Sequence, residues 1–304
     1  MAKRKKTTDP KVAERRAARK AAQQALASGA AGEAVVAPSR TFHGLPSEPD
    51  WVAMREVVPA ASATARTTAE HGAVDVLVVT LLPRLWPAMK RSDGVVLVAL
   101  QTASSSEDPS RDVAAALLQV LDAEPGSALE HIDLPESGPR LQDVLDLDVP
   151  FEVTVHDTFA YTVPEDGSAP DEAAAALEEA AGGIVPTVRL TGVDAAYWCR
   201  MGEREFLRWA RPEDPEQLLD ALARLHADRA SALDDGSRFV GAFRSCGILV
   251  PVWELADGTE AADIEGPVAA FAPKLDEAIA STEPLTPEQR RARAGLVSRQ
   301  VSLR

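Results

Sequence analysis

The sequence predicts an α+β fold: two related units of mainly antiparallel sheet, each with helices on one face, flanked by basic termini. Residues 151–163 alternate apolar and polar side chains, which is typical of a strand with one buried and one solvated face. Two amphipathic helices begin at matching Glu-Asp-Pro sequences. The 304 residues, 45 % of them hydrophobic, are enough for one large domain or two smaller ones. A Rossmann-like α/β fold is the alternative.

The body is expected to divide into units at residues 51–182 and 183–283, because similar patterns recur in both. Asp108-Pro109 and Asp214-Pro215 each place Asp at the N-cap and Pro at the first position of a helix. Each unit also has a Val-Pro strand start upstream and closes with an Ala-rich segment, at 171–181 and 273–280. An internal duplication is one interpretation, and chance matches in an Ala-rich chain are the other.

Strands are also expected at residues 95–100, 205–209 and 248–255. Pro251 lies in the last of these and predicts an edge strand or a strand end, because proline has no N–H for a ladder. Within residues 151–163, His156 falls on the polar face. Asp157 falls on the apolar face, which predicts either a strand end or bulge, or a buried carboxylate with a partner such as Arg189 or Arg244.

The two ends of the chain have their own patterns. Residues 1–50 predict a basic N-terminal helix, Ala-rich over 11–28, followed by a linker rich in Gly, Pro and Ser. Residues 284–304 predict a basic C-terminal helix that opens with the capping-box pattern Thr-Pro-Glu-Gln. The apolar side of this second helix predicts docking on the body or on a partner.

Charge is divided unevenly along the chain, whose formal net charge is −15. Residues 1–20 hold nine basic and two acidic side chains, a net of +7, and residues 285–304 hold five and one, a net of +4, which leaves −26 for the body. An anionic body repels phosphate and anionic lipid, whereas clustered basic residues release counterions on contact with a polyanion. The basic ends therefore could bind RNA or DNA. The alternatives are that they fold back onto the acidic body, form a disordered, solubilising extension, or contact a membrane surface. The candidate polyanion-binding residues are Lys3, Arg4, Lys5, Lys6, Arg15, Arg16, Arg290, Arg291 and Arg293.

Several classes of protein are excluded by missing motifs. No lysine follows a glycine as a Walker phosphate loop requires, and no Gly-x-Gly-x-x-Gly or Gly-x-Ser-x-Gly sequence is present. The Cys and His residues do not cluster as a zinc site needs, so no cofactor or metal is predicted. Two cysteines, no export signal and no apolar run of membrane-spanning length predict a cytoplasmic protein without a transmembrane segment.

One segment of the acidic body concentrates aromatic and guanidinium groups, the side chains most enriched at binding hot spots. We treat it as the candidate protein-binding site. The alternative is that the aromatic rings belong to the core and the arginines pair with Glu203, Glu205 and Glu213. The candidate residues are Tyr197, Trp198, Arg200, Arg204 and Arg208.

The opening residues MAKRKK and the closing residues PEQRRARAGLVSRQVSLR, together with the Ala/Arg/Asp-rich body, resemble an uncharacterised family of actinobacterial proteins over the full chain. That resemblance implies a bacterial cytosolic setting and no known activity. Each half also resembles the small α+β modules of the SseB-like group, through its Val-Pro strand and Pro-capped helix. The second likeness implies no catalytic residues.

Taken together, the sequence predicts a non-enzymatic cytosolic binding or adaptor protein. Its acidic body would bind a protein, and its basic tails would contact RNA or the ribosome. One alternative is an enzyme of unrecognised class with a site near Asp157 or Cys199. The other is a self-associating protein, a homo-oligomer in which the C-terminal helix docks on a neighbouring subunit.

Overall fold

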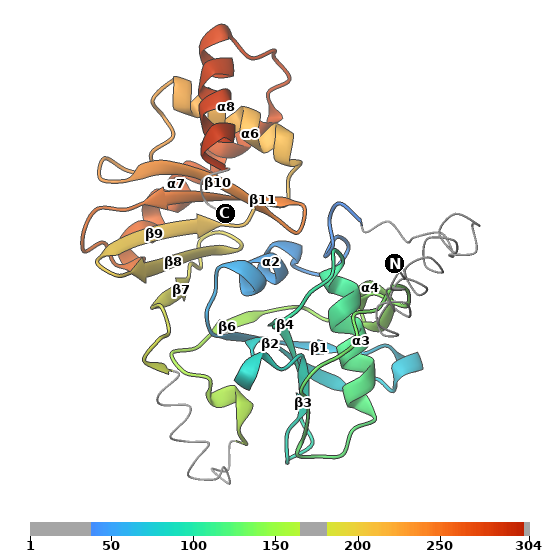
Figure 1. Cartoon of the computed structure of the whole chain (residues 1–304). Coiled ribbons are helices and arrows are strands. Elements are labelled where there is room, and N and C mark those ends of the chain that lie inside the picture. The colour runs from blue at the N-terminus through green and yellow to red at the C-terminus, as the bar shows by residue number, and fades with distance from the viewer. Residues whose placement is uncertain (1–37, 165–180, 301–304) are drawn as a thin grey trace, which may run out of the picture. The chain divides into compact units, whose positions relative to one another are not determined.

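The computed structural model describes residues 38–164 and 181–300, apart from the side chains of residues 299 and 300. The chain separates into residues 1–36 and 37–304, and every described residue belongs to the second part. That part contains two modules, each built around one sheet (Figure 1). The predicted helix at residues 11–28 and most of the Ala-rich segment at 171–181 lie outside the described residues.

The first module is a mixed six-stranded sheet with strand order β5-β3-β4-β2-β1-β6, in which β2 and β4 are parallel and the other pairs antiparallel. Helix α3 covers one face, where its Val113 and Leu117 join the core with Val78 and Val98. The elements are α2 (Glu48–Glu56), β1 (Ala61–Arg66), η1 (Ala69–His71), β2 (Asp75–Leu81), η2 (Pro83–Leu85), β3 (Ala88–Lys90), β4 (Val96–Gln101), α3 (Pro109–Leu121), β5 (Ser127–Leu129), α4 (Leu141–Val144), β6 (Val153–Val155) and η3 (Ala160–Thr162).

The second module is a five-stranded antiparallel sheet with strand order β10-β11-β9-β8-β7. Helices α6 and α7 cover one face, where Leu222 and Phe271 share a core with Trp198 and Trp253 (Figure 1). The elements are β7 (Thr187–Arg189), β8 (Ala196–Met201), β9 (Arg204–Trp209), α6 (Pro215–Ala227), β10 (Arg238–Ser245), β11 (Ile248–Glu254), α7 (Ala261–Ala280) and α8 (Pro287–Gln300).

Helix α2 joins the two modules. Its Trp51 and Met54 are fully buried, and its neighbours in that core include Tyr197 and Val250 of the second sheet. Asp50 on the same helix accepts a hydrogen bond from the Tyr197 hydroxyl at 2.6 Å and one from Arg189 at 3.1 Å. Residues 41–50, which the sequence placed in a linker, are therefore part of the folded body.

The predicted α+β class is confirmed, and so are the strands expected at 95–100 and 205–209, which are β4 and β9. The prediction of one long strand over 151–163 was wrong, because β6 pairs with β1 only through residues Val153–Val155. Beyond that point the chain leaves the sheet and forms η3, so that Tyr161 packs against the face of the first sheet opposite α3. Asp157 is exposed just after the end of β6, so the strand-end alternative holds and the alternative of a buried carboxylate is wrong.

Strand β11 is not an edge strand, since β10 and β9 pair with it on either side. The ladder with β9 begins only at Val252, so Pro251 lies just outside it and needs no N–H there. Among the described helices, none is long and apolar enough to cross a membrane.

Candidate functional site

The second sheet leaves part of one face uncovered, and this is the candidate site. Strand alternation places Leu207 and Trp209 of β9 under the helices, and places Arg204, Phe206 and Arg208 on the opposite face. Helix α2 covers only the part of that face near Tyr197 and Val250. We call the remainder the open face, and its residues are Met201, Arg204, Phe206, Arg208, Arg238, Val240, Phe243, Val252 and Glu254.

A groove of about 420 Å³ lies on the open face next to the end of α2. Most of its side chains are half-buried, and Met201 is 41 % exposed. The apolar walls of the groove offer surface that a bound molecule would remove from water. The groove is lined by Glu56, Met201, Phe206, Arg208, Val240, Phe243 and Val252.

Arginine side chains border the groove. Those of Arg204 and Arg238 are 67 % and 70 % exposed, and both pair with Glu254, whose own side chain is only 18 % exposed. The hydrogen bond from Arg238 holds the pKa of Glu254 below its usual value. Arg208 donates to the Val57 carbonyl at 3.3 Å and contacts the Met201 sulfur. Arg204, Arg208 and Arg238 thus outnumber Glu56 and Glu254 at the groove by one positive charge, although the body as a whole carries a large negative charge.

The five residues predicted to bind protein do not form one patch. Tyr197 is 1 % exposed, and its burial, together with the nearby Asp50 charge, raises its pKa well above the usual value. Trp198 is buried on the helix side and donates its indole N–H to the Thr259 carbonyl at 2.9 Å. Arg200 stacks over Trp198, with its guanidinium carbon 5.1 Å from the ring centroid, and it pairs with Glu205 and Glu260. Of the five, only Arg204 and Arg208 lie on the open face.

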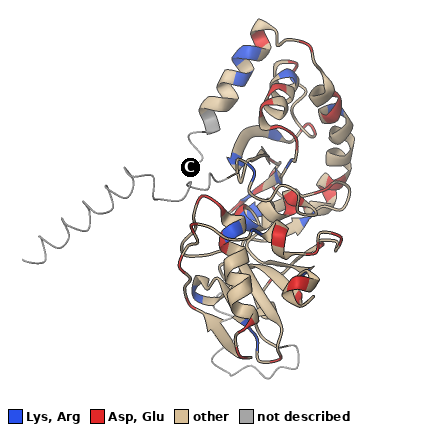
Figure 2. Cartoon of the chain, turned by 90° about the vertical axis from the view of Figure 1, so that its right-hand side faces the viewer, with Lys and Arg blue, Asp and Glu red and all other residues tan. Residues whose placement is uncertain are grey.

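The residues predicted to bind a polyanion are partly within the described chain. Lys3, Arg4, Lys5, Lys6, Arg15 and Arg16 lie outside it. Arg290 and Arg291 are exposed on α8. Arg293, on the same helix, pairs with Asp220 and Glu216 of α6, and Leu296 is buried against the core of the second module. The apolar side of α8 therefore docks on the body of the same chain. In Figure 2, α8 carries basic segments, and the helices near it carry acidic ones.

The groups considered for catalysis are placed unfavourably for it. Burial raises the pKa of the Cys199 thiol, and the Arg208 charge only partly offsets this, so the thiol form is favoured. Asp157 lies in an exposed turn. Within residues 38–164 and 181–300, no group of three or more His, Cys, Asp or Glu side chains is arranged to hold a metal ion.

One polar pair escaped the sequence analysis. The Ser62 hydroxyl lies 2.7 Å from Nε2 of His156, and burial lowers the pKa of that imidazole. The residues are 94 positions apart and meet because β1 and β6 are neighbouring strands. No sequence motif links them, so only the strand pairing could have predicted the contact.

Comparison with known proteins places this chain in a family without assigning it an activity. Residues 41–304 match DUF5926, which is described as a family of unknown function. No curated protein and no solved structure matches the chain, so the weaker likeness to SseB-like modules has no support there. The expected membership in an uncharacterised family is confirmed: because the match covers more than half of its length, the chain belongs to the family DUF5926.

Proposed function

We propose that this chain is a non-enzymatic binding protein that holds an acidic, apolar segment of a partner protein in the groove on the open face. The observation that carries the proposal is the combination of half-buried apolar side chains in that groove with Arg208 in its lining and the exposed Arg204 and Arg238 on the same face. Burial of apolar surface would supply affinity, and the arginines would select the sign of the partner's charge.

The choice of an acidic partner rests on charge complementarity. The body carries a net charge of about −26 by the count given above, so it repels most acidic polypeptides at long range. The open face is a local exception, because Arg204, Arg208 and Arg238 outnumber Glu254 and Glu56 around the groove. A basic partner would instead be attracted to the rest of the surface, without preference for this groove.

The proposal is tested with a random peptide library selected against the full chain. We expect the selected peptides to combine acidic residues with aromatic or branched aliphatic ones. Met201→Glu and Arg204→Glu change exposed side chains and should leave the fold intact. Each should weaken the selected peptides at least about tenfold, because it places a negative charge at the groove.

The matched control is Arg290→Glu, which makes the same charge change as Arg204→Glu on the exposed side of α8. It should leave peptide binding unchanged. Selection of basic peptides, or acidic peptides that bind Met201→Glu and Arg204→Glu as well as the unaltered chain, would overturn the proposal.

A second candidate function is contact of the basic ends with RNA or the ribosome in the cytoplasm. It is favoured by Arg290 and Arg291, whose side chains are exposed on α8. Arg293 on the same helix is instead engaged in ion pairs with α6. The test is RNA binding by the full chain over a range of salt concentrations, compared with a chain lacking residues 1–20. We expect the shortened chain to bind more weakly and with a smaller salt dependence. Equal binding by both chains would contradict this function.

A further inference from the structure

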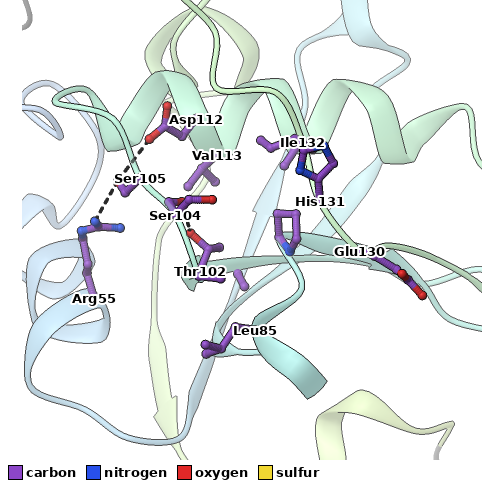
Figure 3. A pocket seen from close by; sticks show the side chains of 14 residues that line it. Arg55, Leu85, Thr102, Ser104, Ser105, Asp112, Val113, Glu130, His131 and Ile132 are labelled. Atoms are coloured by element: carbon purple, nitrogen blue, oxygen red, sulfur yellow. Dashed lines mark hydrogen bonds between the residues drawn. The ribbon is translucent and has the colours of Figure 1, made fainter. Parts of the chain in front are cut away.

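The groove on the open face has an oxidisable side chain in its wall, the thioether of Met201. A cavity of about 230 Å³ in the first module differs from it, because no methionine or cysteine is among the described residues that line that cavity. Polar groups of the cavity already bond to one another, with Arg55 donating to the Ser105 hydroxyl and Ser105 donating to Asp112 (Figure 3). Of the two, only the groove has a wall that an oxidant can change.

Met201 is the most exposed methionine in the described part of the chain. It is 41 % exposed, whereas Met54 is fully buried and Met89 is half-buried against the first sheet. The fourth methionine, Met1, lies outside the described residues. A peroxide reaches a thioether from solvent, so the rate of oxidation follows exposure. The fold therefore predicts that Met201 is oxidised before Met54 and Met89.

The position of Met201 beside Arg208 gives its oxidation a consequence for the groove. Both residues line the groove, and the Arg208 guanidinium contacts the Met201 sulfur. A thioether sulfur is a weak hydrogen-bond acceptor, whereas the oxygen of a sulfoxide is polar and accepts strongly from a charged donor. Oxidation would therefore place a polar group in the apolar wall and engage the Arg208 guanidinium. The groove would lose both apolar surface and a cation that is available to a partner.

We propose that Met201 is a modification site, at which oxidation to the sulfoxide by hydrogen peroxide releases a partner from the groove. The sulfur donates an electron pair to one peroxide oxygen, and the S–O bond forms as the O–O bond breaks. The other oxygen takes the proton from the first and leaves as water, so the sulfur is oxidised by two electrons and the peroxide is reduced. The release of a partner rests on the proposed function of the groove, whereas the selective oxidation of Met201 does not.

Mass spectrometry of the full chain after graded treatment with hydrogen peroxide tests the selectivity. We expect the fragment that contains Met201 to gain one oxygen at least about ten times faster than the fragments that contain Met54 and Met89. Burial raises the pKa of the Cys199 and Cys246 thiols, which disfavours the reactive thiolate, and dithiothreitol reverses cysteine oxidation to a disulfide without reducing a methionine sulfoxide. Equal rates at Met201 and Met89 would overturn the proposal, whether or not the groove binds a peptide.

Peptide binding before and after the same treatment tests the release. We expect the oxidised chain to bind the strongest peptide from the library selection at least about tenfold more weakly than the untreated chain does. Methionine sulfoxide reductases for both sulfoxide epimers should restore the binding.

Two variants assign the loss of binding to Met201. Met201→Leu has no sulfur, so peroxide should leave its affinity for the peptide at the value measured before treatment. The matched control is Met89→Leu, which removes a methionine outside the groove and should lose peptide binding on oxidation as the unaltered chain does. Equal losses in Met201→Leu and in the unaltered chain, or full binding by a chain that carries the sulfoxide at Met201, would overturn the proposal. A library that yields no acidic peptide contradicts the proposed function instead, and the oxidation rates then decide the modification site.

Discussion

The two Glu-Asp-Pro helix starts share a sequence and use their aspartates differently. At α6, the Asp214 carboxylate accepts hydrogen bonds from the backbone N–H groups of Glu216 at 2.9 Å and Gln217 at 3.0 Å, as an N-cap does. At α3, Asp108 makes no cap bond. It is 5 % exposed and accepts from the Thr41 hydroxyl at 2.8 Å and from Arg140 at 3.0 Å. The motif predicts where each helix begins, and the surroundings decide what the carboxylate does.

Two hairpin turns of the second sheet likewise share a local feature and differ in what surrounds it. Gly202 in the β8–β9 turn and Gly247 in the β10–β11 turn both have positive φ, at 65° and 85°. A Cβ on Gly202 would meet nothing within 4 Å, whereas one on Gly247 would lie 1.9 Å from the Ser39 carbonyl oxygen. Asp108 and Gly247 thus both contact the segment 39–41, which precedes α2. The contacts of Asp108 and Gly247 with this segment therefore also connect the two modules.

The largest expected effect follows from removing the buried carboxylate at α3. Asp108→Ala leaves the half-buried Arg140 and the buried Arg111 without their acidic partner and removes the acceptor for Thr41. Breaking a buried charged pair in this way costs about 3–5 kcal/mol. Urea unfolding of the variant and of the unaltered chain measures the loss. A loss of about 1 kcal/mol would mean that Asp108 acts only as an ordinary cap, and the contrast with α6 would disappear.

The next largest effect is expected at the β10–β11 turn. Gly247→Ala forces a left-handed backbone on a residue with a Cβ and drives that atom into the Ser39 backbone, for a combined loss of about 2–4 kcal/mol. Gly202→Ala is the matched control, because it has the backbone cost alone and should lose about 1–2 kcal/mol. Thermal unfolding of both variants compares the two turns. Equal losses would show that the close approach to Ser39 contributes nothing.

A smaller effect is expected at the α6 cap. Asp214→Ala removes two hydrogen bonds to backbone N–H groups at an exposed helix end, which costs about 1 kcal/mol. Asp214→Ser should recover most of this loss, because serine is an equally good N-cap residue. Recovery by the corresponding Asp108→Ser change at α3 is not expected, since serine carries no charge for the arginines. Urea unfolding measures the free energy of unfolding of all four variants, the Ala and Ser changes at Asp108 and at Asp214.

Local patterns predicted the elements well and their contacts poorly. Pro109 and Pro215 mark helix starts through a backbone effect that needs no neighbours, so α3 and α6 begin where expected. The bond from Tyr197 to Asp50 spans 147 positions, and no periodicity carries information over that distance. The local concentration of arginine and aromatic residues was enough to predict Arg204 and Arg208 as binding residues of the open face. Phe206 and Val252 could not be predicted to line the groove, because that required knowing which part of the sheet α2 covers.

The smallest expected effect concerns a third matched pair, the two histidines that lie beside serines. His156 Nε2 lies 2.7 Å from the Ser62 hydroxyl in the first module, and His226 Nδ1 lies 3.0 Å from the Ser231 hydroxyl in the second. Burial lowers the pKa of His156 below its ordinary value of 6.5, and the nearby Asp157 charge only partly restores it. The unfolded chain therefore binds a proton at this residue at a higher pH than the folded chain does.

From this difference, the contribution of His156 to stability is fully present above pH 6.5 and is lost as the pH falls from there to the folded-state pKa. His156→Gln keeps a hydrogen-bonding side chain beside Ser62 and removes the titration. Unfolding free energies measured between neutral and mildly acidic pH should fall more steeply in the unaltered chain than in the variant. His226→Gln serves as the comparison, and it locates the effect in the first module if only the His156 change flattens the pH profile. Parallel profiles for the unaltered chain and His156→Gln would mean that the folded and unfolded chains protonate His156 alike, and that burial at the β1–β6 edge does not disfavour its charge.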